Sequence, residues 1–427
     1  GISMNNYITE AEKQTKIGGK YDVIVAGSGP SGFAAAVAAA RNGAKTLIIE
    51  AQSSIGGVST SGLMSHFTGR VESKLYSEIL DRAHAKNYFD CADKTKIDPE
   101  LLKITYLEML HEAGIEILFY TLVCGVIKDG NKVKGVITES KSGRTAFLAS
   151  AVIDGTGDGD VACLAGAEYF LGRESDAKMQ PATLMFKVGG VDMTRAPLPP
   201  SFETKVETAK GELQALAKKI LPFPAGHVLL YSSPIPGIVT CNMTNCIDVD
   251  GTKAEDLTRA EVVCRMQMEP IVKFLREYVN GFENCYIVSA ASLIGVRETR
   301  HFKGVNQLNE TDIIEARQFD DWVVRDAWFN FDVHNMSGAS LDATGVQKEF
   351  KQNKGYTIPY GCMVPEKIDG LLLTGRNISG THMAHSSFRA MPVCVGIGEA
   401  CGTAAALAVK NGTELRDVNP HDIQKLL

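Results

Sequence analysis

The sequence predicts an α/β fold, a parallel sheet with a β-meander, into which a second, α+β domain is inserted. Three observations lead to this prediction. A β-branched run, a glycine-rich turn and an alanine-rich stretch follow one another over residues 21–41. Apolar segments separated by short turns recur over residues 115–154, as in a meander. Proline-rich loops and one long helical stretch occupy residues 190–350, before strand and helix patterns return at 368–407.

The first element is a unit of strand, turn, helix and strand. Residues 21–26 form a β-branched run typical of a buried strand, and residues 33–41 form an alanine-rich helix that ends before Gly43. The turn between them, residues 27–32, reads Gly-Ser-Gly-Pro-Ser-Gly, and the second strand covers residues 46–49. This order indicates a Rossmann-like dinucleotide-binding unit.

Single residues of this unit have defined roles in holding a dinucleotide. Gly27 permits a tight turn, Gly29 lets the backbone approach a pyrophosphate, and Gly32 lets the helix lie close to the strand. The helix N-terminus offers free N–H groups to the phosphates. Glu50 stands 18 residues after Gly32 (50 − 32), where an acid binds adenosine ribose hydroxyls. The alternative is a glycine-rich turn in another α/β protein.

Small residues, two helices and the meander follow Glu50. Gly56 and Gly57 stand in a loop suited to close backbone approach to a ligand, with a flexible surface loop as the alternative. One helix is predicted over 72–85, and a second opens with Asp98 as N-cap and Pro99 at its first position. The strands predicted for the meander cover residues 115–118, 121–126, 133–137 and 144–147.

The segment 151–160 joins an apolar strand to a loop of glycines and acids. Asp154, Asp158 and Asp160 stand close together in it, which allows either a metal site or a loop beside a cofactor. Asp160 is also placed to cap the helix that follows. Glycines dominate the loop, so we favour the cofactor-side loop and predict no metal site.

The first and last portions of the chain are expected to share one domain. Residues 255–278 predict a long helix with a proline inside it, within the proline-rich middle portion. The last portion returns to a strand near 371–375 and a glycine-opened, alanine-rich helix. We therefore expect a nucleotide-binding domain over 20–190 and 351–427, and an inserted substrate or cap domain over 191–350.

Composition excludes several classes of partner. The 427 residues carry 44 basic and 50 acidic side chains, a formal net charge of −6, so neither nucleic acid nor an anionic membrane is expected. The apolar stretch 23–40 is interrupted by Gly, Ser and Pro, and the N-terminal residues are too polar for a signal peptide. A cytoplasmic protein without a membrane span is expected. None of the ten cysteines forms C-x-x-C, and a redox pair of Cys241 and Cys246 is the alternative to buried, reduced thiols.

Several stretches together resemble the FAD-dependent oxidoreductases of the glutathione-reductase-like, two-dinucleotide-binding flavoprotein superfamily. They are the glycine unit with Glu50, the Gly56–Gly57 loop, the Asp154–Gly157 segment, and residues 373–379 with the glycine-opened helix after them. Within that superfamily the chain resembles the family that includes the flavin subunit of heterodisulfide reductases. Residues 295–300 and 332–335 belong to the resemblance too, which extends over most of residues 20–410.

The resemblance implies FAD as the cofactor, bound in an extended pose. The implied cofactor-binding residues are Gly27, Gly29, Pro30, Ser31, Gly32, Glu50, Ala51, Gly56, Gly57, Val58, Ser59, Val123, Thr156, Gly157, Asp158, Gly375, Arg376 and Gly398. Val123 is expected to meet the adenine through its backbone. The helix opened by Gly398 is expected to direct its N-terminus at the flavin N1/C2 carbonyl, where negative charge collects on reduction.

Departures from the superfamily pattern reduce the range of reactions that the chain is expected to catalyse. Residues 58–61, Val-Ser-Thr-Ser, stand where disulfide reductases carry a redox cysteine pair, so dithiol chemistry is not expected there. A second complete glycine unit is absent from the sequence, and so are iron–sulfur motifs. A dedicated NAD(P)H domain is therefore not expected. Gly375–Arg376 replaces the usual Gly–Asp near the ribityl chain.

Flavin chemistry needs groups that move a proton and groups that orient the substrate. The candidate catalytic residues are His385, His382, Arg389, Arg297, Arg300 and His334. His382 and His385 are candidates for proton transfer near neutral pH, and Arg389 for holding a substrate carboxylate through two hydrogen bonds. The alternatives are structural: a histidine that binds flavin or packs in the core, and a buried pair between an arginine and Glu298.

These inferences predict an FAD-dependent oxidoreductase that transfers a hydride between a small polar or anionic substrate and flavin N5. A separate electron donor or acceptor of unknown identity is expected. One alternative is an electron-transfer subunit that relays electrons between protein partners. Another is a non-redox flavin-binding module. The sequence predicts no oligomeric state.

Overall fold

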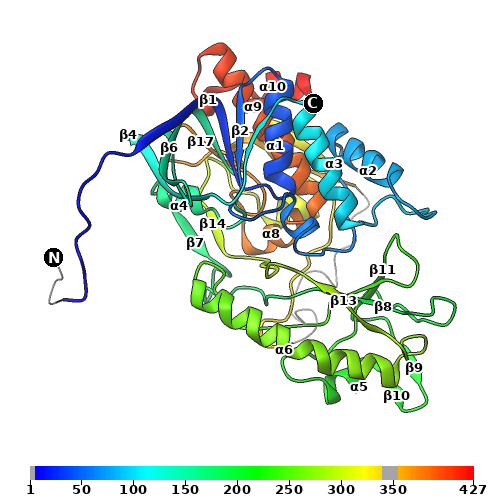
Figure 1. The fold of residues 1–427 in the computed structure, drawn as a ribbon. Coiled ribbons are helices and arrows are strands. Elements are labelled where there is room, and N and C mark those ends of the chain that lie inside the picture. Colours follow the sequence, from blue (N-terminus) through cyan, green and yellow to red (C-terminus); the bar gives the residue numbers. More distant parts are fainter. Residues whose placement is uncertain (1–4, 339–353) are drawn as a thin grey trace.

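The computed structural model describes residues 5–338 and 354–427, and a mostly parallel sheet forms its centre (Figure 1). The seven strands follow the order β3-β2-β1-β6-β5-β4, with β17 paired to β6. Their bounds are β1 (Lys16–Ala26), β2 (Thr46–Ile49), β3 (Glu116–Leu118), β4 (Leu122–Asp129), β5 (Lys132–Ser140), β6 (Gly143–Asp154) and β17 (Leu371–Leu373). Strands β1, β2, β3, β6 and β17 are parallel, and β4, β5 and β6 form an antiparallel meander. The predicted α/β class with a meander is confirmed.

The long strand β6 joins the meander to the parallel sheet. Its first residue pairs with Ser140 of β5, and its last three pair with β17. We predicted two short strands there, over 144–147 and 151–154; one strand forms because no glycine or proline interrupts residues 144–153. Strand β1 likewise begins at Lys16, earlier than the predicted residue 21, because it pairs with β6 from Thr145 onward.

Five helices lie near this sheet, and two of them touch backbone to backbone. They are α1 (Pro30–Arg41), α2 (Lys74–Ala85), α3 (Pro99–Glu112), α9 (Met391–Asn411) and α10 (Pro420–Leu426). A Cβ atom at Gly398 of α9 would lie 2.1 Å from the carbonyl oxygen of Ser31, and one at Gly402 would lie 2.0 Å from that of Ala35. Only glycine permits so close an approach of α9 to α1.

The predicted start of this last helix was wrong. Helix α9 begins at Met391, with Pro392 in its first turn, and Gly398 lies inside the helix. Gly398, which the sequence suggested as the opening of the helix, instead allows α9 to pack closely against α1. The predicted cap of α3 is confirmed, since Asp98 accepts a hydrogen bond from Glu100 N at 3.0 Å. Helix α2 begins two residues later than predicted, with Ser73 as its N-cap, which accepts a hydrogen bond from Tyr76 N. Asp160, expected as an N-cap, is the first residue of α4 (Asp160–Leu164), and Gly159 holds the cap position.

Helix α9 is long and apolar enough to span a membrane by length and composition alone. However, 83% of its most apolar window is buried inside the protein. Its apolar residues contact α1 and the sheet rather than forming a free apolar surface. These contacts are those of a core helix.

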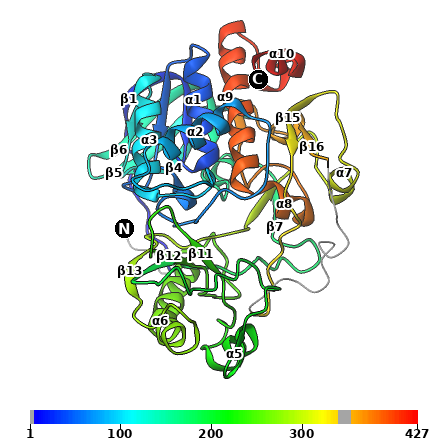
Figure 2. The same cartoon turned by 90° about the vertical axis from the view of Figure 1, so that its right-hand side faces the viewer.

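A second, smaller sheet and two helices form a separate lobe below the parallel sheet (Figures 1 and 2). The sheet has the order β11-β12-β8-β13. The elements of this lobe are β8 (Phe186–Gly189), β9 (Glu207–Thr208), β10 (Gly211–Glu212), α5 (Leu213–Ile220), β11 (Leu230–Ser232), β12 (Val239–Cys241), α6 (Ala254–Tyr278) and β13 (Tyr286–Ala290). Its buried apolar residues form their own cluster over 182–291, joined by Leu63. Helix α6 confirms the long helix predicted over 255–278.

The remaining elements connect the two parts. They are β7 (Tyr169–Leu171), β14 (Arg300–Phe302), α7 (Glu310–Ile314), β15 (Trp322–Ala327), β16 (Tyr356–Pro359) and α8 (His382–Phe388). Buried apolar residues from Phe302 to Phe331 belong to the cluster around the parallel sheet. The domain boundaries at 190/191 and 350/351 stay predictions, and the second lies outside the described residues.

Candidate functional site

A cavity of about 660 Å³ lies where the glycine turn faces the second lobe. Its walls come from the turn between β1 and α1, the end of β2, the loop after β6 and the loop after β17. Residues of α6 and of the segment 292–296 complete the wall from the other side. The carboxyl ends of parallel strands β1, β2, β6 and β17 therefore meet at this cavity, which is where α/β sheets bind ligands.

The turn at the cavity has the geometry of an anion cradle. Gly27 has φ +88°, and a Cβ there would lie 2.2 Å from the carbonyl oxygen of Gly155. At Gly29, by contrast, no protein atom lies within 4 Å of the position of a Cβ, so its backbone faces open space. Gly29 is also the N-cap of α1, with no side-chain cap bond. The first N–H groups of α1 are thus left for a ligand.

Glu50 lies at the same cavity with its carboxylate already positioned. Its Oε1 accepts hydrogen bonds from Ser28 N at 3.0 Å and Ser28 Oγ at 2.6 Å, and its Oε2 accepts one from Gln52 N at 2.9 Å. A carboxylate oxygen has two acceptor sites, so capacity remains for ligand hydroxyls.

The opposite wall carries a positive side chain with an unused donor. Arg376 Nη2 lies 3.1 Å from Asp158 Oδ1, and that oxygen also accepts a hydrogen bond from Thr299 Oγ1 at 2.6 Å. Arg376 Nη1 is buried and has no hydrogen-bond partner within the described chain. The open turn, the bare helix N-terminus and this orphan guanidinium nitrogen fit a ligand with phosphate groups.

Most of the predicted cofactor-binding residues meet at this cavity. Those that line it are Gly27, Gly29, Pro30, Ser31, Glu50, Ala51, Gly57, Val58, Val123, Thr156, Gly157, Asp158, Gly375 and Arg376. Gly32, Gly56, Ser59 and Gly398 do not line it. A Cβ at Gly32 would lie 2.0 Å from the Gly27 carbonyl oxygen, and Ser59 is fully buried with its hydroxyl on the Gly56 carbonyl. These residues shape the turn and its packing.

The acids predicted as a metal site or cofactor-side loop have separate partners. Asp154 accepts hydrogen bonds from Thr156 and from Ala162 N. Asp158 pairs with Arg376, and Asp160 pairs with Arg300 at 2.9 Å. Burial raises the pKa of Asp154 to about 6, although its hydrogen bonds act in the opposite direction.

Two candidate catalytic residues, Arg389 and His334, lie against one carboxylate, Asp332, and the charge of a third, Arg297, acts on it. Arg389 lines the cavity, and its Nη2 lies 2.7 Å from Asp332 Oδ2. His334 Nε2 lies 3.4 Å from the same oxygen. Arg297 donates to Thr183 Oγ1 at 2.9 Å and to the Pro181 carbonyl, and it has no ion pair among the described residues.

Electrostatics leave this group of side chains with one excess positive charge. Burial lowers the pKa of Arg297 to about 10, so the guanidinium stays charged at neutral pH. Burial lowers the pKa of His334 to about 4, helped by the charge of Arg297, so this imidazole is neutral. Burial would raise the pKa of Asp332, but His334, Arg389 and Arg297 outweigh it and hold that pKa well below its usual value. Arg389 thus pairs with this carboxylate, and the charge of Arg297 acts on it from a greater distance.

The other candidate catalytic residues lie elsewhere. Arg300 binds Asp160 and the Asp158 carbonyl oxygen. His382 and His385 lie against Glu298, away from the cavity lining. Both histidines lie in helix α8, where they are buried.

Sequence reasoning missed several residues of the site. Asp332 and His301 were not singled out, since an isolated Asp or His carries no pattern. The wall residues of α6, which are Leu257, Thr258, Glu261 and Val262, were also missed. They lie on a helix whose pattern predicts only an amphipathic face.

The redox pair considered for Cys241 and Cys246 has no support. Both side chains are buried thiols, and burial raises the pKa of each. Cys246 Sγ lies 3.3 Å from Arg259 Nη1. Neither cysteine lines the cavity.

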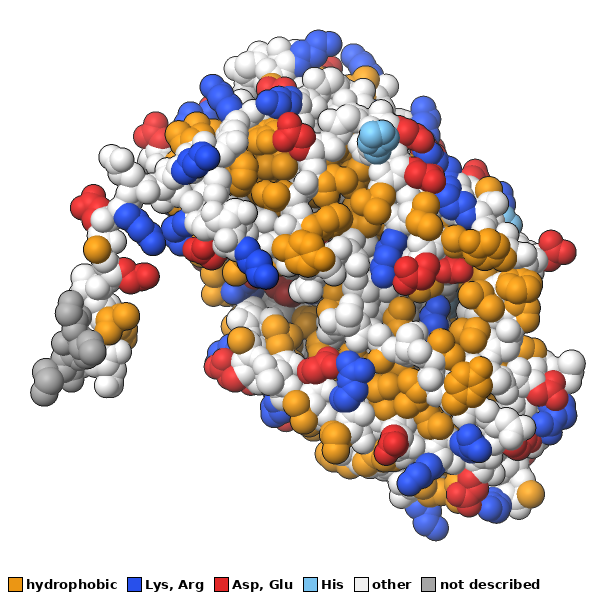
Figure 3. Space-filling view, in the orientation of Figure 1, with side chains coloured by type: hydrophobic (Ala, Val, Ile, Leu, Met, Phe, Trp, Pro, Cys, Tyr) orange, Lys and Arg blue, Asp and Glu red, His pale blue; other side chains and the backbone are white. Residues whose placement is uncertain are grey.

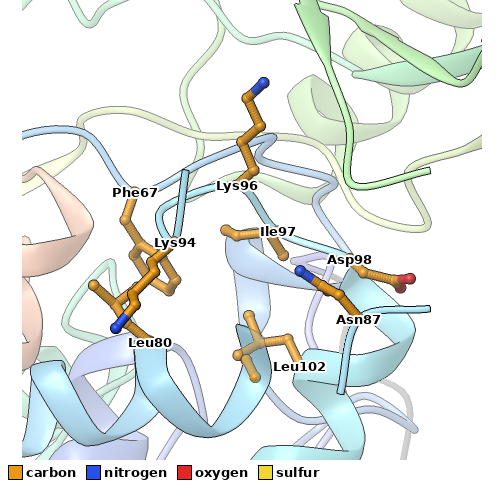
Figure 4. A pocket seen from close by; sticks show the side chains of 9 residues that line it. Phe67, Leu80, Asn87, Lys94, Lys96, Ile97, Asp98 and Leu102 are labelled. Atoms are coloured by element: carbon orange, nitrogen blue, oxygen red, sulfur yellow. The ribbon is translucent and has the colours of Figure 1, made fainter. Parts of the chain in front are cut away.

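Two further surface features do not compete with this site. A pocket of about 10 Å³ lies beside α2 and α3, lined by Phe67, Leu80 and Leu102 among others (Figure 4). That volume holds no more than one water molecule. On the face shown in Figure 3, basic and acidic side chains are interspersed, without an extended patch of one sign.

Known proteins resemble this chain over most or part of its length. Residues 22–427 match the family described as FAD dependent oxidoreductase. A thiamine thiazole synthase of Methanococcus vannielii is 34% identical over 151 residues, which cover 32% of this chain and 56% of that protein. Digeranylgeranylglycerophospholipid reductase 1 of Methanococcoides burtonii is 27% identical over 199 residues, covering 42% and 47%. The chain spans about half the length of the curated relatives it matches.

Solved structures share the fold at low sequence identity. OxyS anhydrotetracycline hydroxylase from Streptomyces rimosus superposes with a TM-score of 0.50 and 12% identity. The match covers 92% of this chain and 63% of that one. At this identity the likeness concerns the fold alone.

Proposed function

Because the chain belongs to the FAD dependent oxidoreductase family and is therefore an FAD-binding enzyme, we propose that it transfers a hydride between a small anionic substrate and flavin N5. The observation that supports this proposal is an excess of guanidinium charge: Arg389 pairs with Asp332, and the charge of Arg297, which has no ion pair among the described residues, acts on the same carboxylate. Net positive charge beside the cofactor cavity favours a substrate that carries a carboxylate.

The residues that would hold FAD follow from the cavity. The turn 27–32 and the N-terminus of α1 would bind the pyrophosphate, Glu50 the adenosine ribose, and Arg376 the phosphate or ribityl groups. Bound FAD supplies a two-electron acceptor or donor that the side chains of the protein lack. The protein contributes binding and orientation.

Arg389 and His334 have distinct proposed roles. Arg389 reaches both the cavity and Asp332, and its buried Nε has no partner among the described residues. It would hold the substrate carboxylate. His334 does not line the cavity, and its Nε2 lies 3.4 Å from Asp332 Oδ2. A base with a pKa of about 4 is a weak proton acceptor at pH 7, so His334 would act by holding Asp332, and through it Arg389, in place.

The test is anaerobic reduction of the flavin absorbance by a panel of hydroxy acids, amines, sugars and NAD(P)H. We expect a carboxylate compound to bleach the flavin and its carboxamide analogue to do so only weakly. Arg389→Gln should raise KM for the carboxylate about 10- to 100-fold, the value of a lost charged hydrogen bond. FAD content should stay that of the wild type. Arg195→Gln, an exposed arginine that pairs with Asp192 and Glu283 away from the cavity lining, is the matched control.

Two results would argue against the proposal. If the carboxylate compound and its carboxamide analogue reduced the flavin equally, the arginines would not be recognising a substrate carboxylate. A flavin that no panel compound reduces would favour the electron-transfer subunit or the non-redox module instead.

The finer relationship is also a proposal. We infer that the chain is related to the flavin subunit of heterodisulfide reductases within the glutathione-reductase-like superfamily. The order of the glycine unit, the double glycine, the 154–157 segment and residues 373–379 supports this. Dithiol chemistry after the double glycine is not part of the proposal, because residues 58–61 contain no cysteine. We also propose that residues 191–350 form the inserted substrate domain. A further proposal is that the protein is located in the cytoplasm.

A further inference from the structure

Four side chains with metal-ligating atoms converge behind the cavity, outside the proposed substrate site. Glu298 Oε2 lies 2.9 Å from His301 Nε2, 2.5 Å from His382 Nδ1 and 3.9 Å from His385 Nδ1. Glu298 lies just before β14, His301 lies within β14, and the other two come from α8. We call Glu298, His301, His382 and His385 the buried histidine cluster.

This cluster is shut off from solvent. The relative exposure of the four side chains is 0% for Glu298 and His301, 4% for His382 and 1% for His385. Three of its atoms are buried without a hydrogen-bond partner in the described parts of the chain: Glu298 Oε1, His301 Nδ1 and His385 Nδ1. Native interiors rarely leave so many polar atoms of one group unused.

The charge of Glu298 is also uncompensated by arginine or lysine. Within residues 5–338 and 354–427, its only ion-pair partners are the three histidines. The neighbouring arginines in the sequence bind other side chains: Arg297 donates a hydrogen bond to Thr183, and Arg300 donates one to Asp160. A buried carboxylate needs a positive partner, either a protonated imidazole or a cation.

We propose that Glu298, His301, His382 and His385 bind one divalent transition-metal ion, with Zn²⁺ as the best fit. Imidazole nitrogen and carboxylate oxygen are the donors that Zn²⁺ prefers after thiolate. Zn–N and Zn–O distances of about 2.1 Å place tetrahedral ligand atoms roughly 3.4 Å apart. The separations from Glu298 Oε2 are 2.5 Å to His382, 2.9 Å to His301 and 3.9 Å to His385. The ligand atoms of Glu298, His301 and His382 all lie within 4.8 Å of one another, and a shift of the His385 side chain toward them would complete four ligands.

Four protein ligands in a closed, dry site indicate a structural ion. Structural zinc sites are four-coordinate, whereas catalytic ones keep a position open to water. The ion would join the 298–301 segment to α8, whose C-cap is Arg389. It would thus position that arginine at the cavity, whichever reaction the cavity supports.

The test is metal analysis of the tag-free holoprotein by inductively coupled plasma mass spectrometry. Protein is incubated with Zn²⁺ in the presence of excess Mg²⁺ and then passed through gel filtration. We expect about one Zn²⁺ per chain in the wild type, and strong loss of zinc in Glu298→Gln and His382→Gln. His111→Gln, exposed in the last turn of α3, is the matched control and should keep the zinc. Flavin content is measured in parallel and is independent of the metal readout.

A second measurement needs no variant. Zn²⁺ should raise the melting temperature of the wild-type holoprotein, since an ion that binds only the folded state stabilises it, and Mg²⁺ should not. Wild-type protein that retains no zinc and shows no shift would overturn the proposal. So would Glu298→Gln protein that is folded, by circular dichroism, and still carries stoichiometric zinc. In either case the cluster would be a hydrogen-bonded Glu–His network only.

Discussion

At the residue scale, buried polar groups decide what the cavity can accept. Asp332 lies against Arg389 and His334, and the charge of Arg297 also acts on it, so its own charge is more than balanced. His227 lies in the same region, with Phe202 edge-on to both His227 and His334. Burial lowers the pKa of His227 to about 3. The site is therefore built from neutral imidazoles and charged guanidinium groups.

The neutral histidines predict a loss of stability in acid. The pKa values of His334, about 4, and His227, about 3, lie below the unfolded value of about 6.5. Between pH 6.5 and 4 the unfolded chain binds protons at these sites and the folded chain does not. Each histidine therefore lowers the free energy of unfolding as pH falls through that window.

Urea denaturation at pH 7 and pH 5 measures this effect. Asp154 acts in the opposite sense, because its folded pKa is raised to about 6. The difference between wild type and His227→Gln isolates the histidine. We expect the variant to lose less stability than the wild type between the two pH values. Parallel losses in both proteins would contradict the assignment. His421→Gln, half exposed on α10, is the control.

Residue roles were predictable where a motif fixes the backbone. Gly27, Gly29 and Glu50 line the cavity because the strand–turn–helix pattern is local. His382, His385 and Arg300 carry no such pattern, and none of the three lines the cavity. Their partners, Glu298 and Asp160, come from distant segments, so no local signal exists for them.

At the element scale, the contact between α1 and α9 holds the cofactor turn in place. Ser31 lines the cavity on one side, and its carbonyl faces Gly398 on the other. A change on α9 that pushes α1 outward therefore also displaces the first turn of α1. Packing and cofactor binding share this contact.

Gly398→Ala tests that link. The added Cβ would lie 2.1 Å from Ser31 O and 2.9 Å from Ala34 Cβ, so the helices must move apart. We expect a loss of about 1–3 kcal/mol in the free energy of unfolding, and weaker FAD binding. Urea denaturation and FAD release measure the two effects. Lys410→Ala, exposed on the same helix, should change stability by less than about 0.5 kcal/mol. Unchanged stability in Gly398→Ala would show that the helices can separate without strain.

Elements with caps or long periodic patterns were predictable from the sequence. Helices α2, α3 and α6 lie within two residues of their predicted limits. Strands β1 and β6 were predicted too short, because their length depends on pairing with each other. The start of α9 was wrong because a glycine in a helix has the same sequence signature whether it opens the helix or packs against another.

At the scale of the whole molecule, the cavity has walls from both apolar clusters. Gly27–Gly32 belongs to the larger part, and Leu257–Val262 of α6 belongs to the second lobe. A bound cofactor would therefore touch both parts. This arrangement was expected in outline, as an inserted domain, but the wall residues from α6 depend on how the two parts face each other.

Hydrogen exchange measured with and without FAD tests whether the cofactor contacts both parts of the protein. Removing FAD should speed exchange of backbone amides in residues 254–262 as well as in 27–32, because both lose a partner. Helix α5 lines no part of the cavity and should exchange equally in both forms. Faster exchange in 27–32 alone would mean that the cofactor contacts only the larger part.

The central sheet is built from two segments that lie far apart in the sequence, and this has a consequence for synthesis on the ribosome. Strands β1 to β6 are made first, whereas β17 and α9, which complete the same core, leave the ribosome only after residue 411. Until then the face of α1 that meets Gly398 and Gly402 has no cover, and the cavity lacks Gly375 and Arg376. The complete cavity for FAD therefore forms only after the segment 371–411 has been made. A nascent chain paused in the second lobe would expose an apolar helix to chaperones and proteases.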